Sequence, residues 1–147
     1  MKKTLVKAGA LVLLIAILLC LASCGTVEDA AAKADEVLSE NWNSYVTTYK
    51  PWYTYEAELC KVDGELKYWI DIKMTDTAKL ELKGPSSYVI VGNNITSGVF
   101  KKSGIYDDVA KMFEKYPEVE VVIIFYDRDD NPTYYFLNGE FRSLKNN

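Results

Sequence analysis

Three acidic side chains and a tryptophan fall at alternate positions of two neighbouring segments: Glu56, Glu58, Trp69 and Asp71. If both segments are strands, these four side chains lie on one face of a hairpin, because alternate residues of a strand point the same way. Paired carboxylates beside an aromatic ring suit acid–base chemistry on a sugar, or the binding of a cation. Lys67 and Lys73 fall on the same face and can neutralise the acids. The four residues are therefore a candidate ligand-binding site, and a solvated charged face is the simpler interpretation.

The absence of histidine from the chain removes whole classes of catalysis. Ser-His-Asp and Cys-His nucleophiles need an imidazole, and so does His-ligated zinc. The formal net charge is -4, from 17 Lys and Arg against 21 Asp and Glu, and it provides no electrostatic basis for binding nucleic acid. We therefore expect a protein that is not an enzyme, with no catalytic residues, no cofactor and no nucleic-acid partner.

Two further groups of residues could carry chemistry. The segment Asp127–Asn131 offers oxygen atoms at alternate positions, as the start of a calcium loop does, but the sixth position is Pro132 and the twelfth is Asn138. A calcium loop needs glycine and a bidentate glutamate there, so we interpret the segment as a polar hairpin turn and expect no metal site. Cys60 lacks a histidine to activate it, and we expect a structural or incidental thiol.

The first 24 residues differ in composition from the rest of the chain. Their only charges are Lys2, Lys3 and Lys7, and an apolar run of about 15 residues follows, as in a secretory signal. The run ends in Leu21-Ala22-Ser23-Cys24, which resembles the lipobox of bacterial lipoproteins. The resemblance implies that a diacylglycerol is attached to the sulfur of Cys24 and that a signal peptidase cleaves before it. A signal anchor is the alternative, although a spanning helix needs about 20 apolar residues.

Cleavage at this position defines the domains. Residues 1–23 would be the signal peptide, and residues 24–147 a single mature domain anchored by its lipid. Three lysines leave with the signal, so the net charge changes from -4 to -7. We expect this domain on the extracytoplasmic side of a bacterial membrane, and held close to it, because the first predicted helix begins at Thr26.

Two helices are indicated by apolar residues that recur at spacings of three and four. The first is predicted from Thr26 to the residue before Pro51, and Thr26 and Asp29 have the spacing of a capping box. The second is predicted from Ser103 to Tyr116, because Pro117 stops it.

The strands are indicated by apolar residues that recur at a spacing of two. Asp63-Gly64 predicts a two-residue hairpin turn, which pairs residues whose numbers sum to 127 and places Glu56 opposite Asp71. Further strands are predicted at residues 78–82, 88–91, 119–126 and 133–137. The strand at 119–126 is apolar on both faces, so we expect it at the centre of the sheet.

These elements predict an α+β fold: an antiparallel or mixed sheet of about six strands with two helices on one face, in the order αββββαββ. The expected function is a lipid-anchored extracytoplasmic binding or interaction lipoprotein of the bacterial cell envelope, with an envelope protein or a glycan as partner. Two alternatives stay open. One is a small carboxylate-dependent hydrolase of cell-wall glycans, and the other is a purely structural envelope lipoprotein.

Overall fold

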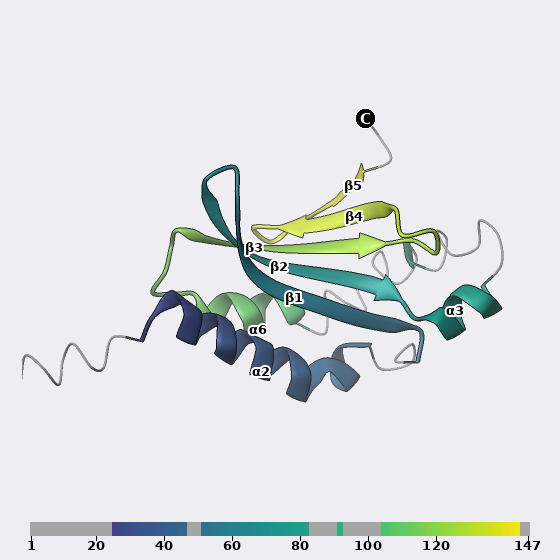
Figure 1. Cartoon of the computed structure of the whole chain (residues 1–147), viewed down its shortest axis with the longest axis horizontal. Helices are drawn as coiled ribbons and strands as arrows, with labels where there is room; N and C mark the ends of the chain where they lie inside the picture. Colours follow the sequence, from purple (N-terminus) through teal and green to yellow (C-terminus); the bar gives the residue numbers. More distant parts are fainter. Residues whose placement is uncertain (1–24, 47–50, 83–90, 93–103, 145–147) are drawn as a thin grey trace, which may run out of the picture.

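The structure is a computed structural model that describes residues 25–46, 51–82, 91–92 and 104–144. The described part is an α+β fold with three helices and five strands (Figure 1). In chain order these are α2 (Val27–Val46), β1 (Tyr53–Val62), β2 (Glu65–Met74), α3 (Asp76–Glu81), α6 (Ile105–Met112), β3 (Val119–Tyr126), β4 (Pro132–Leu137) and β5 (Glu140–Ser143). Among these residues no helix is long and apolar enough to span a membrane.

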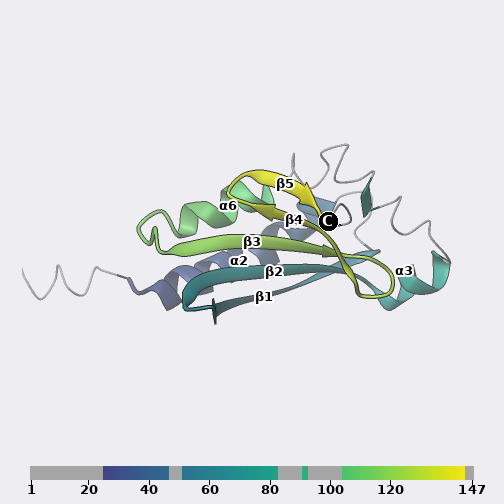
Figure 2. The same ribbon diagram turned by 90° about the horizontal axis from the view of Figure 1, so that it is seen from above.

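The five strands form one mixed sheet in the order β1-β2-β3-β4-β5. β2 and β3 run parallel, whereas every other neighbouring pair is antiparallel. A parallel pair needs a crossover connection over one face of the sheet, and α6 lies in that connection. Figure 2 shows α6 and α2 together behind the sheet, which confirms the prediction that both helices cover one face.

Helix α2 begins at the predicted capping box. The Thr26 amide donates to Oδ2 of Asp29 at 2.7 Å, and the Asp29 amide donates to Oγ1 of Thr26 at 3.2 Å. Two of the unpaired amides at the start of the helix are satisfied in this way. The predicted stripe packs on the sheet along the helix, with Ala34 and Leu38 fully buried. Residues 47–50, where the helix was expected to end, lie outside the described part.

The β1–β2 hairpin has the predicted register, and every pair sums to 127. Leu59 opposes Tyr68 on the face that α2 and α6 cover, and Tyr68 and Ile70 are fully buried there. Strand β3 occupies the centre of the sheet, as its apolar sequence predicts. The hairpin and β3 therefore supply most of the sheet's contribution to the core.

The predicted strand at residues 78–82 is wrong, because this segment forms α3. The hydroxyl of Thr75 accepts a hydrogen bond from the Ala78 amide at 3.3 Å and donates one to the Pro51 carbonyl at 2.7 Å. This N-cap satisfies an amide at the start of α3 and so favours the helix. The alternation of apolar residues was misleading, since Leu80 is 72% exposed.

Two other boundaries differ from the prediction. Of the strand predicted at 88–91, the structure describes only Val91, which is helical together with Gly92, so the prediction is wrong at that residue. The second helix is shorter than predicted: α6 begins after Gly104, which has a φ of 75°, and ends at Met112. Its first turn still buries Ile105, as the stripe predicts.

Strand β5 was not predicted at all. It follows β4 through Asn138 and Gly139, whose φ values are 49° and 78°. Asn-Gly is a preferred pair for such a tight hairpin turn, so the signal was present in the sequence. The described order is therefore αββααβββ rather than αββββαββ, and five strands are seen where about six were expected.

Candidate functional site on the outer face of the sheet

One face of the sheet has no described helix over it, and we call it the outer face. Its side chains follow from the strand registers and from the alternation of residues along each strand. The outer face includes Glu56, Glu58, Cys60, Lys67, Trp69, Asp71, Lys73, Glu120, Val122, Ile124, Tyr126, Tyr135, Leu137, Glu140 and Arg142. Figure 2 looks onto this side of the sheet, with α2 and α6 behind it.

The four residues singled out in the sequence do lie together on the outer face. Glu56 is opposite Asp71, and Glu58 is opposite Trp69. The indole Nε1 of Trp69 donates a hydrogen bond of 2.7 Å to Oδ1 of Asp71. The tryptophan is therefore held along its own strand, and one oxygen of Asp71 is already in use. That these residues bind a ligand stays a prediction.

Lys73 lies between the two opposed carboxylates. Its ammonium group donates to Oε2 of Glu56 and lies 3.8 Å from Oδ2 of Asp71. The same nitrogen is 5.5 Å from the centre of the Tyr126 ring, at a distance suited to a cation–π contact. Like charges opposed on two strands repel each other, and Lys73 offsets this repulsion.

The phenol of Tyr126 belongs to the same cluster. Burial raises its pKa to about 12, and the charge of Asp71, a hydrogen bond to Asp71 and the charge of Glu56 act in the same direction. The phenol therefore stays protonated near neutral pH and donates to Asp71. Asp71 thus accepts from both an indole and a phenol, which is an arrangement that fixes side chains in place.

Cys60 and Lys67 oppose each other at the hairpin end of this face. The Lys67 ammonium group donates to Oε2 of Glu120 at 2.7 Å and lies 3.4 Å from Glu65. The pKa of the Cys60 thiol is raised, first by burial and then by the charge of Glu58, while Lys67 acts in the opposite direction. A thiol with a raised pKa is a poor nucleophile near neutral pH, which agrees with the predicted incidental role.

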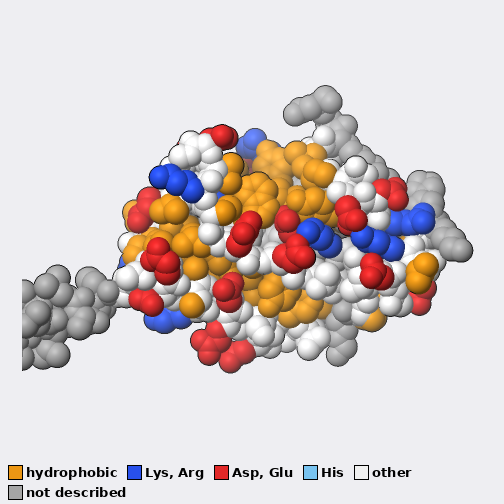
Figure 3. All heavy atoms as spheres, in the orientation of Figure 1, with side chains coloured by type: hydrophobic (Ala, Val, Ile, Leu, Met, Phe, Trp, Pro, Cys, Tyr) orange, Lys and Arg blue, Asp and Glu red, His pale blue; other side chains and the backbone are white. Residues whose placement is uncertain are grey.

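The middle of the outer face is apolar. Val122 and Ile124 are only 5% and 8% exposed, and Trp69, Tyr135 and Leu137 around them are half-buried. In Figure 3 hydrophobic side chains gather over the upper strands of the sheet, and acidic and basic side chains form a row below them. Sequence reasoning missed this apolar centre, although a strand that is apolar on both faces requires a second apolar surface when both helices cover the first.

The acidic loop predicted as a turn is one. Oδ1 of Asp127 accepts hydrogen bonds from the amides of Asp129 and Asn131, both at 2.9 Å. Asp130 forms an ion pair with Lys79 of α3 at 2.7 Å. Two acids of the loop therefore have structural roles, and no group of three His, Cys, Asp or Glu side chains among the described residues could hold a metal ion.

A pocket of about 440 Å³ lies at the hairpin end of the molecule, apart from the four predicted residues. It is lined by Lys61, Gly64, Glu65, Leu66, Pro117, Glu118 and Glu120. It brings the β1–β2 turn next to the turn before β3.

The fold and the outer face define a small α+β domain with one helix-covered face and one apolar, charge-bordered face. The chain matches no protein-family model, and comparison with curated proteins and with solved structures found no similar protein.

Proposed function

We propose that this protein is a lipid-anchored extracytoplasmic binding module of the bacterial cell envelope, attached through Cys24, and that its outer face binds an envelope protein. The observation that carries the proposal is the outer face itself, where buried aliphatic residues lie among half-buried aromatic rings with no described helix over them. Apolar residues bordered by charged ones on one face of a sheet are typical of a site for protein–protein interaction.

The composition of the outer face favours a protein over a glycan as partner. Its centre is aliphatic, with Val122 and Ile124 opposite Leu137 and Tyr135 on β4. Protein interfaces have apolar centres and charged borders, and the charged border here is the cluster of Glu56, Asp71 and Lys73. A glycan site depends instead on stacking against aromatic rings, whereas the centre of this face is aliphatic.

The anchor is supported by the lipobox pattern of Leu21-Ala22-Ser23-Cys24. Thr26 and Asp29 start α2 directly after the predicted lipid site. Labelling of cells with a radioactive fatty acid tests the attachment, with full-length protein and its Cys24→Ala variant. We expect label in the first and none in the second. Equal labelling of both, or label in neither, would contradict the anchor.

The partner surface is tested by photo-crosslinking in intact cells, with the photoreactive side chain placed on one face at a time. Position 135 reports the outer face, and position 36, which is exposed on α2, is the matched control. We expect a discrete crosslinked protein from position 135, lost when Leu137→Asp is added, and none from position 36. Crosslinks to glycan only, or from position 36 only, would contradict the proposal.

The hydrolase alternative has a direct test in the purified protein. It requires turnover of a cell-wall glycan that is lost in Glu58→Gln or Asp71→Asn. The Asp71 carboxylate already accepts a hydrogen bond from Trp69 and lies beside Lys73, which favours a structural role for it over proton transfer. The purely structural alternative is tested by the crosslinking above, since it expects no discrete partner from either position.

A further inference from the structure

Gly25 directly follows Cys24 in the sequence, and it is held in place. The phenol of Tyr116, in the segment before β3, donates a hydrogen bond to the Gly25 carbonyl. The next residue, Thr26, is held by the capping box with Asp29. Gly25 is therefore tied to the α6–β3 connection and joined to the start of α2, with no spacer between these contacts and residue 24.

Two turns lie at the same end of the molecule as Gly25. Tyr116 is followed by Pro117 and Glu118, which line a pocket together with Gly64 of the β1–β2 turn. Figures 1 and 2 both show the start of α2, the β1–β2 turn and the connection into β3 at one end, and α3 at the other. We call the end with Gly25 and the two turns the anchor end.

We propose that the lipid on Cys24 holds the anchor end against the membrane surface and directs the α3 end away from it. The inference rests on the proposed lipid attachment and adds the orientation of the domain. One residue of extended chain spans about 3.3 to 3.6 Å, so the acyl chains must enter the bilayer close to Gly25. The membrane contact is therefore decided by where Gly25 lies on the folded domain.

Two other orientations of the domain are compared with the proposed one. If the domain lay on its outer face, the sheet would separate Gly25 from the bilayer, because Gly25 is at the start of α2 and α2 is in the other layer. A tether of one residue is too short for that. If the domain lay along α2, the anchor end and α3 would both be close to the membrane, and the experiment below separates this orientation from the proposed one by comparing a label at each end.

The orientation has a consequence for the proposed partner. The outer face extends along the long dimension of the domain, from the anchor end towards α3. With the anchor end on the membrane, this face looks sideways into the envelope, and lipid does not cover it. A membrane-attached or soluble envelope protein can then reach Tyr135 and Leu137.

Fluorescence quenching in membrane vesicles tests the orientation with the full-length, processed protein. A Cys60→Ser background leaves the introduced cysteine as the thiol that is labelled, because Cys20 is removed with the signal and Cys24 carries the lipid. Glu65→Cys places the label at the anchor end, and Thr77→Cys places it on α3; both positions are exposed. The vesicles contain lipids with a nitroxide on the headgroup. We expect loss of fluorescence at position 65 and none at position 77.

Two variants serve as controls for the short tether. A long Gly–Ser linker inserted between residues 24 and 25 keeps the lipid but frees the domain, so the difference between the two labels should disappear. Tyr116→Phe removes the hydrogen bond to Gly25 and keeps the ring, so the difference should shrink.

The readouts separate the two proposals. The mass of the protein and its flotation with vesicles report the lipid, and quenching reports the orientation. An unmodified Cys24 would overturn the proposed anchor and this inference with it. A lipid-modified protein with equal quenching at positions 65 and 77 would overturn the orientation alone.

Discussion

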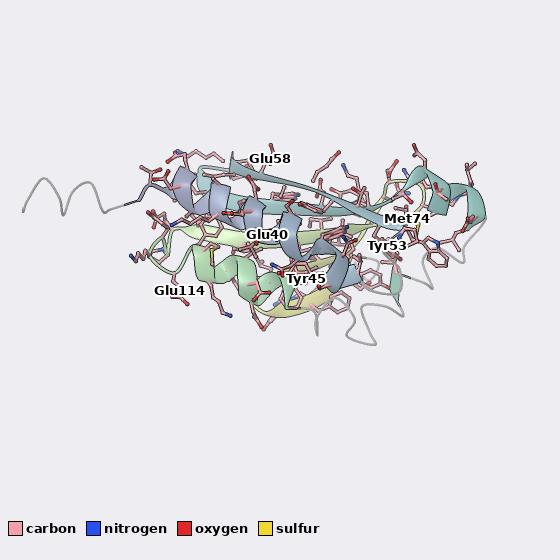
Figure 4. All side chains as sticks on the ribbon, turned by 90° about the horizontal axis from the view of Figure 1, so that it is seen from below. Glu40, Tyr45, Tyr53, Glu58, Met74 and Glu114 are labelled. Carbon is pink, nitrogen blue, oxygen red and sulfur yellow. The ribbon has the colours of Figure 1, made fainter. Side chains whose placement is uncertain are left out.

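The phenol of Tyr45 on α2 donates a hydrogen bond of 2.8 Å to Oδ2 of Asp108 on α6, and so joins the two helices that cover the sheet (Figure 4). A similar bond ties α2 to the sheet, because the phenol of Tyr68 donates to Asp35. In both cases a largely apolar ring is buried while its hydroxyl reaches a carboxylate nearer the surface. These two bonds add to the apolar packing that holds α2 on the sheet.

The Tyr45–Asp108 bond should contribute measurably to stability. We expect Tyr45→Phe to lower the free energy of unfolding by about 1 to 2 kcal/mol, because the bond has a charged acceptor and a buried donor ring. Urea unfolding followed by circular dichroism measures the change. The control is Tyr106→Phe on α6, since within the described part of the chain the Tyr106 hydroxyl makes no side-chain hydrogen bond. Equal losses in the two variants would show that the hydrogen bond is not the cause.

The protein should lose stability at alkaline pH. The pKa of Tyr126 is raised from 10.0 to about 12, and burial raises those of Tyr45 and Tyr68 in the same direction. Between pH 10 and 12 the unfolded chain therefore binds fewer protons than the folded one, so the free energy of unfolding falls as the pH rises. Urea midpoints at pH 8 to 11 measure the slope.

Tyr126→Phe is the matched variant for this effect. Its urea midpoint should fall less between pH 10 and 11 than that of the unaltered protein, because one titrating group with a raised pKa has been removed. A midpoint that is constant from pH 9 to 11 in the unaltered protein would contradict the assigned pKa directions.

Side chains of β2 and α3 should respond very differently to truncation. Ile70 is fully buried, so Ile70→Ala should cost about 2 to 5 kcal/mol of unfolding free energy. Leu80 is 72% exposed on α3, so Leu80→Ala should change it by less than about 0.5 kcal/mol. Thermal and urea unfolding measure both. A large loss for Leu80→Ala would favour the strand that the sequence pattern predicted.

The reactivity of Cys60 should depend on two neighbouring charges in opposite ways. Burial and the charge of Glu58 raise the pKa of the thiol, whereas Lys67 lowers it. Since the thiolate is the reactive form, Glu58→Gln should speed alkylation by iodoacetamide near pH 8 and Lys67→Ala should slow it. A background with Cys20→Ala and Cys24→Ala leaves Cys60 as the one thiol of the chain. Equal rates in both variants would mean that these charges do not reach the sulfur.

Local signals explain what the sequence determined by itself. The Thr26–Asp29 capping box and the Asp63-Gly64 turn each act within a few residues, and both appear where they were predicted. The turn also decides which residues of β1 and β2 oppose each other. The cross-strand pair of Glu56 and Asp71 could therefore be predicted without a structure. The apolar run at 119–126 likewise identified the central strand, because only a central strand buries both faces.

The tertiary structure decided everything that depends on distant segments. The parallel pairing of β2 with β3 joins strands that are far apart in the sequence. No local sequence pattern predicts which strand pairs with which across such a long connection. That pairing places Val122 beside Trp69 and so creates the apolar centre of the outer face. It also brings Tyr126 of β3 to Lys73 and Asp71 of β2. The physical reason is that turns and caps are decided by neighbouring residues, whereas a shared face is decided by which strands pack together.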